Sequence, residues 1–194
     1  MTEHGARVAG SIILIHGASS AGKSTLCRAL QQRIDAPFWH YSIDHLRDSG
    51  VLPSERIRSR EFSWSALRTA FFDGFHRSIG AFAGAGNNLI VEHIVETEAW
   101  LADLVDALTG VDVFFVALHC PLDELERREA ARGDRPVGMA KTDFATVHGF
   151  ADYDLELDST ALLERNVDAL LAAWAARRSP SAFERAALRR LAST

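Results

Sequence analysis

Ser11 to Ser24 reads SIILIHGASSAGKS, and this stretch decides the fold. An apolar run from Ile12 to Ile15 leads into the pattern G-x-x-x-x-G-K-S, and a helical pattern follows it. A chance glycine-rich turn is the alternative, but the motif has both the strand before it and the helix after it that a P-loop requires. The stretch therefore predicts a P-loop that binds a nucleoside triphosphate. The residues expected to surround the phosphates are Gly17, Ala18, Ser19, Ser20, Ala21, Gly22, Lys23, Ser24 and Thr25.

The chemistry of a phosphate site accounts for each residue type in this motif. Gly17 and Gly22 allow turns in which backbone N–H groups close around phosphate oxygens. The positive end of the following helix faces the same anion. Lys23 is expected to reach the β- and γ-phosphates and to act in catalysis, while the Ser24 hydroxyl is expected to bind Mg²⁺.

Composition limits the classes of function. The 194 residues suit one domain, and 47% apolar with 24% charged residues is ordinary for a globular protein. A net charge of −5 gives no long-range attraction to nucleic acid or to an anionic membrane, so neither is expected as a partner. Cys27 and Cys120 are the only cysteines, and together with the absence of an apolar signal-peptide core they favour a reducing cytoplasm. Both thiols are expected to pack in the core.

Five apolar segments alternate with helical patterns along the chain. This alternation predicts an α/β fold in which helices cover both faces of a five-stranded parallel sheet. Ligands of such sheets bind beyond the carboxyl ends of the strands, so residues at those ends should share one rim. The predicted strands are 12–15, 38–43, 89–91, 111–118 and 153–157, and the main predicted helices are 24–34, 62–82, 97–108 (with Thr97 as N-cap) and about 160–177 (with Ser159 or Thr160 as cap). Residues 51–60 read as a polar connection.

Two acidic residues are expected on that rim. Asp44 ends the second strand, which we expect beside the P-loop, where its carboxylate would accept the proton of a substrate hydroxyl that attacks the γ-phosphate. Its alternative role is to cap the helix that follows, since aspartate is favoured at that position. Glu92 ends the third strand, where it is expected to orient Mg²⁺ together with Ser24.

Arginines gather after the fourth strand, in the segment REAARGDR. Arg128, Arg132 and Arg135 fall within eight residues, so a loop that carries them would close over the phosphates and neutralise charge during transfer. A solvated basic helix end is the alternative reading. The histidines show no pair at metal-ligand spacing, so a structural zinc site is not expected.

The chain also resembles the chloramphenicol phosphotransferase-like family of small P-loop kinases. The resemblance rests on GASSAGKS, SIDHL, RREAARGDRPVGMAK and VHGFADYDLELDST, and it covers roughly residues 12–174. It implies a nucleoside-monophosphate-kinase-like P-loop fold with an arginine-bearing lid, and transfer of the γ-phosphoryl group of ATP to a hydroxyl of a small molecule such as chloramphenicol. By motif position it makes Asp44 the base, gives Arg132 and Arg135 to the lid, and places Arg128 near the adenine.

This reading divides the chain into a tail (1–10), a kinase domain (11–178, with a lid at about 128–148) and a helical extension (179–194) that either docks or frays. Three functions remain open at this point. The favoured one is an ATP- and Mg²⁺-dependent O-phosphotransferase that inactivates an antibiotic or modifies a metabolite. The others are a kinase of nucleotides or other metabolites, and a nucleotide switch without a small-molecule acceptor.

Overall fold

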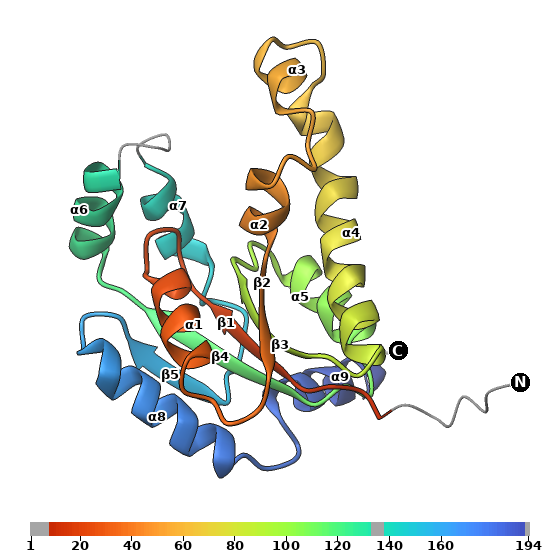
Figure 1. The fold of residues 1–194 in the computed structure, drawn as a ribbon, viewed down its shortest axis with the longest axis vertical. Coiled ribbons are helices and arrows are strands. Elements are labelled where there is room, and N and C mark those ends of the chain that lie inside the picture. The colour runs from red at the N-terminus through yellow and green to blue at the C-terminus, as the bar shows by residue number, and fades with distance from the viewer. Residues whose placement is uncertain (1–7, 133–137, 193–194) are drawn as a thin grey trace, which may run out of the picture.

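The computed structural model describes residues 8–132 and 138–192. Its centre is a five-stranded, fully parallel sheet in the order β2-β3-β1-β4-β5, as the alternation of apolar segments predicted (Figure 1). The strands are β1 (Ile12–His16), β2 (Phe38–Ser42), β3 (Asn88–His93), β4 (Val113–His119) and β5 (Leu155–Asp158). The helices are α1 (Lys23–Gln31), α2 (Ile43–Asp48), α3 (Ser54–Arg58), α4 (Trp64–Gly84), α5 (Glu98–Ala107), α6 (Leu122–Arg132), α7 (Met139–Thr146), α8 (Leu163–Ala175) and α9 (Ala182–Ala192).

The side chains of the strands alternate between two cores, because successive residues of a strand face opposite sides of the sheet. In β1, Ile13 and Ile15 pack with α1 and α8, whereas Ile12 and Leu14 pack with α4, α5 and α9. These two groups of helices lie on opposite faces of the sheet in Figure 1. All four of these β1 side chains are buried, as expected of a strand at the centre of a parallel sheet.

The order of the strands corrects one expectation. We expected β2 beside the P-loop strand, but β3 lies between β2 and β1, so that Glu92 pairs with Ile15 on one side and with Ser42 on the other. The crossover from β1 to β2 therefore skips one position, which β3 fills later. As a result, Glu92 lies on the strand directly beside the one that leads into the P-loop.

Local signals were right at some helix ends and wrong at others. Thr97 caps α5 by accepting a hydrogen bond from the Trp100 N–H, as predicted. The predicted cap of α8 is wrong, because this helix begins at Leu163, well after Ser159 and Thr160. The predicted connection 51–60 contains the short helix α3, which lies with α2 and the start of α4 at one end of the molecule (Figure 1).

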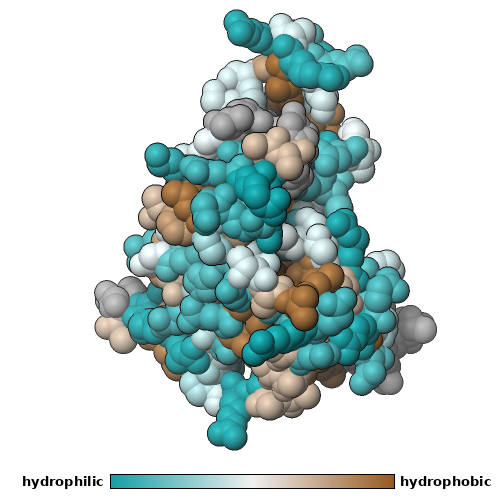
Figure 2. Space-filling model, turned by 90° about the vertical axis from the view of Figure 1, so that its left-hand side faces the viewer, coloured by the Kyte–Doolittle hydropathy of each residue, from teal (hydrophilic) through white to brown (hydrophobic). Residues whose placement is uncertain are grey.

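The C-terminal extension docks on the domain. The side chain of Phe183 in α9 is buried, and its ring meets the ring of Phe115 edge-on, with 5.1 Å between their centroids. Arg190 of the same helix pairs with Asp106 of α5 at 2.8 Å. Hydrophilic side chains dominate the face of the molecule in Figure 2, and the hydrophobic ones on it form small separate groups. Within the described residues, no helix combines the length and the apolar character that a membrane span needs.

Candidate active site

The P-loop leaves β1 through a contact that only glycine permits. A Cβ atom at Gly17 would lie 2.5 Å from the carbonyl oxygen of Leu118 in β4, so the loop crosses the neighbouring strand with no room for a side chain. Gly22 has φ of 95°, a left-handed conformation that is costly for other residues, and it forms the N-cap of α1. Ser20 also has a positive φ, of 66°. Glycine has no side chain with which to cap α1, so the first N–H groups of the helix remain suited to an anion.

Lys23 lies along the P-loop. Its Nζ donates hydrogen bonds to the carbonyl oxygens of Gly17 (2.9 Å) and Ala18 (2.8 Å), and only 8% of the residue is exposed. Burial lowers the pKa of Lys23, while the carboxylates of Glu92 and Asp143 act to raise it. The ammonium group is thus held beside the loop by oxygens, in a position from which phosphate oxygens can be bound.

Ser24 and Glu92 meet beneath the P-loop. The Ser24 hydroxyl donates to Glu92 Oε1 at 2.7 Å, and His40 of β2 lies on the other carboxylate oxygen, with Nε2 at 2.8 Å from Oε2. Burial raises the pKa of Glu92, but the hydrogen bonds from His40 and Ser24 and the charge of Lys23 outweigh it, so the net pKa is lowered. The site therefore holds an ionised carboxylate next to a hydroxyl. Two such oxygen donors fit the ligand preference of Mg²⁺.

Asp44 does not cap its own helix. The cap of α2 is Ser42, whose hydroxyl accepts a hydrogen bond from the Asp44 N–H at 3.1 Å. The Asp44 carboxylate is half-buried, with Oδ1 at 3.2 Å from Nη1 of Arg47. It lines a cavity of about 510 Å³ that Lys23 and Glu92 also line. Although β3 separates β2 from the P-loop strand, the first turn of α2 brings this carboxylate back to the same cavity.

A second, smaller cavity adjoins the first on the side of α6. It measures about 250 Å³, and its lining includes Gly22, Thr25, Arg128 and Ser159. Arg128 donates to the carbonyl oxygens of Ala21 (3.1 Å) and Ser159 (3.2 Å), and its Nε pairs with Glu124 at 2.6 Å. The guanidinium group thus links the P-loop to the segment after β5.

The other two arginines of the predicted lid are not described at the level of their side chains. Arg132 is the last residue of α6, and Arg135 lies outside the described residues. The predicted lid spans the end of α6, that undescribed segment and α7. Glu129 joins the two helices, because its carboxylate accepts from the N–H groups of Gly138 (2.8 Å) and Ala140 (2.9 Å) at the start of α7.

Sequence reasoning missed two residues that fasten α7 to the P-loop. The Ser19 N–H donates to Asp143 Oδ2 at 2.8 Å, so a carboxylate of α7 occupies one amide of the phosphate-binding loop. His16 Nε2 donates to the carbonyl oxygen of Val147 at 2.8 Å, and its Nδ1 accepts from the Val95 N–H at 3.1 Å. The Asp143 contact joins residues that are 124 positions apart, so no local pattern marks it. His16 carried one signal, since a polar residue ends an otherwise apolar strand directly before Gly17.

Comparisons with known proteins concern the family of the chain. Residues 10–175 match the family described as "Chloramphenicol phosphotransferase-like protein". The "Putative O-phosphotransferase" of Mycobacterium tuberculosis strain H37Rv is 32% identical over 173 residues, which covers 78% of this chain and 76% of that protein. A protein of the same name from strain CDC 1551 matches with the same figures.

Solved structures extend the comparison to the fold. The APS kinase of Mycobacterium tuberculosis in complex with AMPPNP and APS has a TM-score of 0.65 at 18% identity, with 86% of this chain and 98% of that chain covered. The gluconokinase of Sinorhizobium meliloti has a TM-score of 0.60 at 20% identity, with coverages of 87% and 93%. At these identities the likeness concerns the fold alone. The family match and the relative at 32% identity show that the chain belongs to the chloramphenicol phosphotransferase-like family.

Proposed function

We propose that this protein transfers the γ-phosphoryl group of ATP to a hydroxyl group of a small molecule. The observation that supports this most directly is the single cavity that Lys23, Ser24, Glu92 and Asp44 share. A nucleotide switch needs the first three of these residues. The fourth, Asp44, is a carboxylate, which repels phosphates, so its place on this cavity suits an acceptor hydroxyl better than the nucleotide.

The P-loop binds the phosphates in this proposal. The N–H groups at the start of α1 and the ammonium group of Lys23 surround the β- and γ-phosphates and balance their charge. Ser24 and Glu92 hold Mg²⁺, which when bound neutralises charge on the phosphates as the reaction proceeds. His40 keeps the Glu92 carboxylate turned toward this site through its hydrogen bond to Oε2.

Asp44 acts as the general base on the acceptor. The acceptor hydroxyl attacks the γ-phosphorus, the bond from phosphorus to the bridging oxygen breaks, and ADP leaves. The hydroxyl proton passes to the Asp44 carboxylate and from there to solvent. Arg47 at 3.2 Å orients that carboxylate. The exposed side of Asp44 leaves it accessible to a hydroxyl that enters from the direction of α2.

The arginines act at two places. Arg128 holds the nucleoside end, because it lines the smaller cavity together with Thr25 and Ser159. Arg132 and Arg135, whose side chains lie outside the described part of the chain, are given the role of neutralising the charge that develops in transfer. Their effect should therefore appear in kcat more than in the KM for ATP.

Chloramphenicol comes first among the acceptors to test, since it gives the family its name, and we propose inactivation of such an antibiotic as the biological role. Two free thiols, Cys27 and Cys120, suit a reaction in the cytoplasm. A kinase of another hydroxylated metabolite uses the same residues in the same roles, and the acceptor panel separates these two possibilities.

The test compares Asp44→Asn with Asp48→Asn, a matched control that changes an exposed carboxylate of the same helix. Phosphate transfer from ATP is measured with chloramphenicol and a panel of other alcohols. Asp44→Asn should bind ATP nearly as tightly as the wild type but transfer phosphate about 10²–10⁴-fold more slowly, the range for the loss of a general base. Asp48→Asn should keep the wild-type rate. An Asp44→Asn variant with the wild-type rate on a verified acceptor would refute the assignment, and ATP hydrolysis indifferent to every alcohol would favour a switch.

A further inference from the structure

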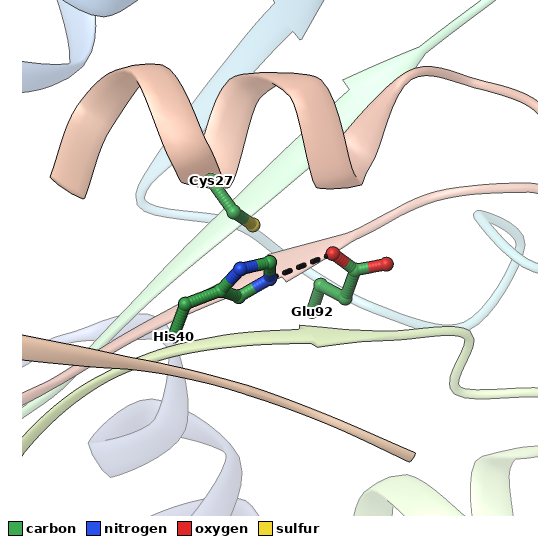
Figure 3. Close-up of side chains that lie close together, drawn as sticks. All are labelled: Cys27, His40 and Glu92. Atoms are coloured by element: carbon green, nitrogen blue, oxygen red, sulfur yellow. Dashed lines mark hydrogen bonds and ion pairs between the residues drawn. The ribbon is translucent and has the colours of Figure 1, made fainter. Parts of the chain in front are cut away.

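Three side chains that can bind a metal ion meet behind the Mg²⁺ residues. Cys27 comes from α1, His40 from β2 and Glu92 from β3, and Figure 3 shows all three turned toward one another. One ligand atom of each, the sulfur, a ring nitrogen and a carboxylate oxygen, lies within 4.8 Å of the other two. Helix α1 lies over the sheet here, so the cluster is enclosed between them.

The cluster is buried, which distinguishes it from acidic groups on a surface. Cys27 has no exposed area, and the side chains of His40 and Glu92 are each 8% exposed. The ring of His45 stands edge-on against that of His40, with 4.7 Å between centroids, and limits its movement. Only Glu92 lines the large cavity, so an ion would enter from that side.

The set of donors selects the kind of ion. Mg²⁺ prefers an all-oxygen shell, which Ser24 and Glu92 begin on one side of the carboxylate. On the other side a thiol sulfur and an imidazole nitrogen join the carboxylate, and sulfur and nitrogen ligands favour Zn²⁺ and related transition metals. Three protein ligands with a fourth position left to water make a recurring form of zinc site.

We propose that Cys27, His40 and Glu92 form a second metal site, specific for Zn²⁺-like ions, which competes with the Ser24–Glu92 site for the Glu92 carboxylate. The hydrogen bond of 2.8 Å between His40 and Glu92 is replaced by bonds from both side chains to the ion. The Cys27 thiol loses its proton to solvent and binds as thiolate. The neutral His40 ring carries its proton on Nε2, which donates to Glu92, so that proton moves to Nδ1 when Nε2 binds the ion. The thiol proton of Cys27 is then the one proton released for each ion that binds.

The expected consequence is inhibition by zinc. In the structure the Ser24 hydroxyl lies 2.7 Å from Glu92 Oε1. When the Glu92 carboxylate turns toward Cys27 and His40 to bind the ion, it moves away from this hydroxyl. This consequence rests on the proposed phosphotransferase function, whereas binding of the ion does not. The two are therefore measured separately.

Binding is measured first, with Co²⁺ as a spectroscopic substitute for Zn²⁺ on the full chain. A thiolate bound to Co²⁺ gives a charge-transfer absorption band in the near ultraviolet, and Zn²⁺ should remove this band by displacing Co²⁺. The band should appear with the wild type and with Cys120→Ser, the matched control at the other buried cysteine. It should disappear with Cys27→Ser and with Cys27→Ala, two variants whose folding is checked by circular dichroism. A wild type without the band, or a Cys27 variant that keeps it, overturns the site.

Inhibition is measured second, as Zn²⁺ titrations of phosphate transfer at saturating Mg²⁺. Cys27 lines neither of the two cavities at the P-loop, so Cys27→Ser should keep the basal rate but need at least about tenfold more Zn²⁺ for half inhibition. Equal inhibition of the variant and the wild type would show that Zn²⁺ acts by replacing Mg²⁺ at Ser24, and would overturn the competition. If no acceptor is found, the proposed function fails, while the Co²⁺ absorption still decides the site.

Discussion

Replacing His16 by glutamine should change how stability depends on pH, because this imidazole is buried in its neutral form. Burial lowers the pKa of His16 from 6.5 to about 3, and His148 and Lys23 act in the same direction. In the unfolded chain the ring takes up a proton below its ordinary value of 6.5, whereas in the folded chain it stays neutral until about 3. The unfolded state therefore binds more protons between these values, and the free energy of unfolding falls as the pH decreases through them.

The size of the effect follows from that shift. One unit of pKa corresponds to about 1.4 kcal/mol, so the full shift of His16 amounts to roughly 5 kcal/mol, lost progressively in acid. Most of that loss falls at a pH too low for a convenient equilibrium measurement. When the pH falls from about 7.5 to about 5.5, a histidine that stays neutral in the fold but takes up a proton in the unfolded chain lowers the free energy of unfolding by about 1.4 kcal/mol.

His16→Gln removes the titrating group and keeps a donor for the Val147 carbonyl. The variant is expected to be less stable at every pH, by about 1–3 kcal/mol, because the Val95 N–H loses its acceptor. Urea unfolding followed by circular dichroism, at several pH values from 8 to 5.5 in the same buffer series, gives both curves. The prediction concerns their slopes, and between about pH 7.5 and about pH 5.5 the wild type should lose about 1.4 kcal/mol more than the variant. Parallel curves would refute the argument that His16 is neutral in the fold.

Three further outcomes follow from the P-loop and its contacts. Lys23→Ala should weaken ATP binding in calorimetry by roughly 10–150-fold, the loss of hydrogen bonds from a charged group, and unchanged binding would disprove the phosphate assignment. Gly17→Ala should lower the free energy of unfolding by about 1–3 kcal/mol, because the added Cβ meets the Leu118 carbonyl oxygen. Gly74→Ala on α4 is the control and should stabilise the fold slightly, because an added Cβ meets nothing within 4 Å there. Equal effects of the two substitutions would contradict the clash at Gly17. Asp143→Asn should tighten ATP binding roughly fivefold, since it removes about 1 kcal/mol of repulsion between a carboxylate and the phosphates, and weaker binding would instead make Asp143 part of the site.

Most of the fold was predictable because strand and helix patterns are local. Four apolar runs and one alternating apolar and acidic segment located all five strands to within two residues at each end, and their alternation with helices predicted that they run parallel. The position of β2 was not predictable in this way, because a strand pattern does not say which neighbour it pairs with. The start of α8 was also missed, since Ser159 looks like a cap but is engaged by Arg128 instead.

The site shows the same division between local and distant information. Lys23, Ser24, Glu92 and Asp44 were predicted because motif and strand ends mark them, and the structure brings all four to one cavity. Asp143 and His16 act through contacts across the fold, and neither belongs to a motif. The cluster of Cys27, His40 and Glu92 was missed for a related reason. Metal-ligand spacing detects pairs on one element, but these three ligands come from three elements that only the sheet order assembles.

The place of β1 in the sheet affects how the chain is made. Among the five strands of the sheet β1 is synthesised first, yet its two partners begin at Asn88 and Val113, so both are still missing when it leaves the ribosome. At about 5–20 residues per second, roughly 5–20 s separate the synthesis of β1 from that of β4. Before β3 is made, the apolar residues of β1 have no neighbouring strand, and one edge of β1 stays unpaired until β4 follows. We therefore expect the nascent chain to bind a chaperone that recognises extended apolar segments. β3 is made before β4, so until β4 follows, the strand that leads into the P-loop has a neighbour on one side only, and we expect ATP to assist folding once both strands are in place.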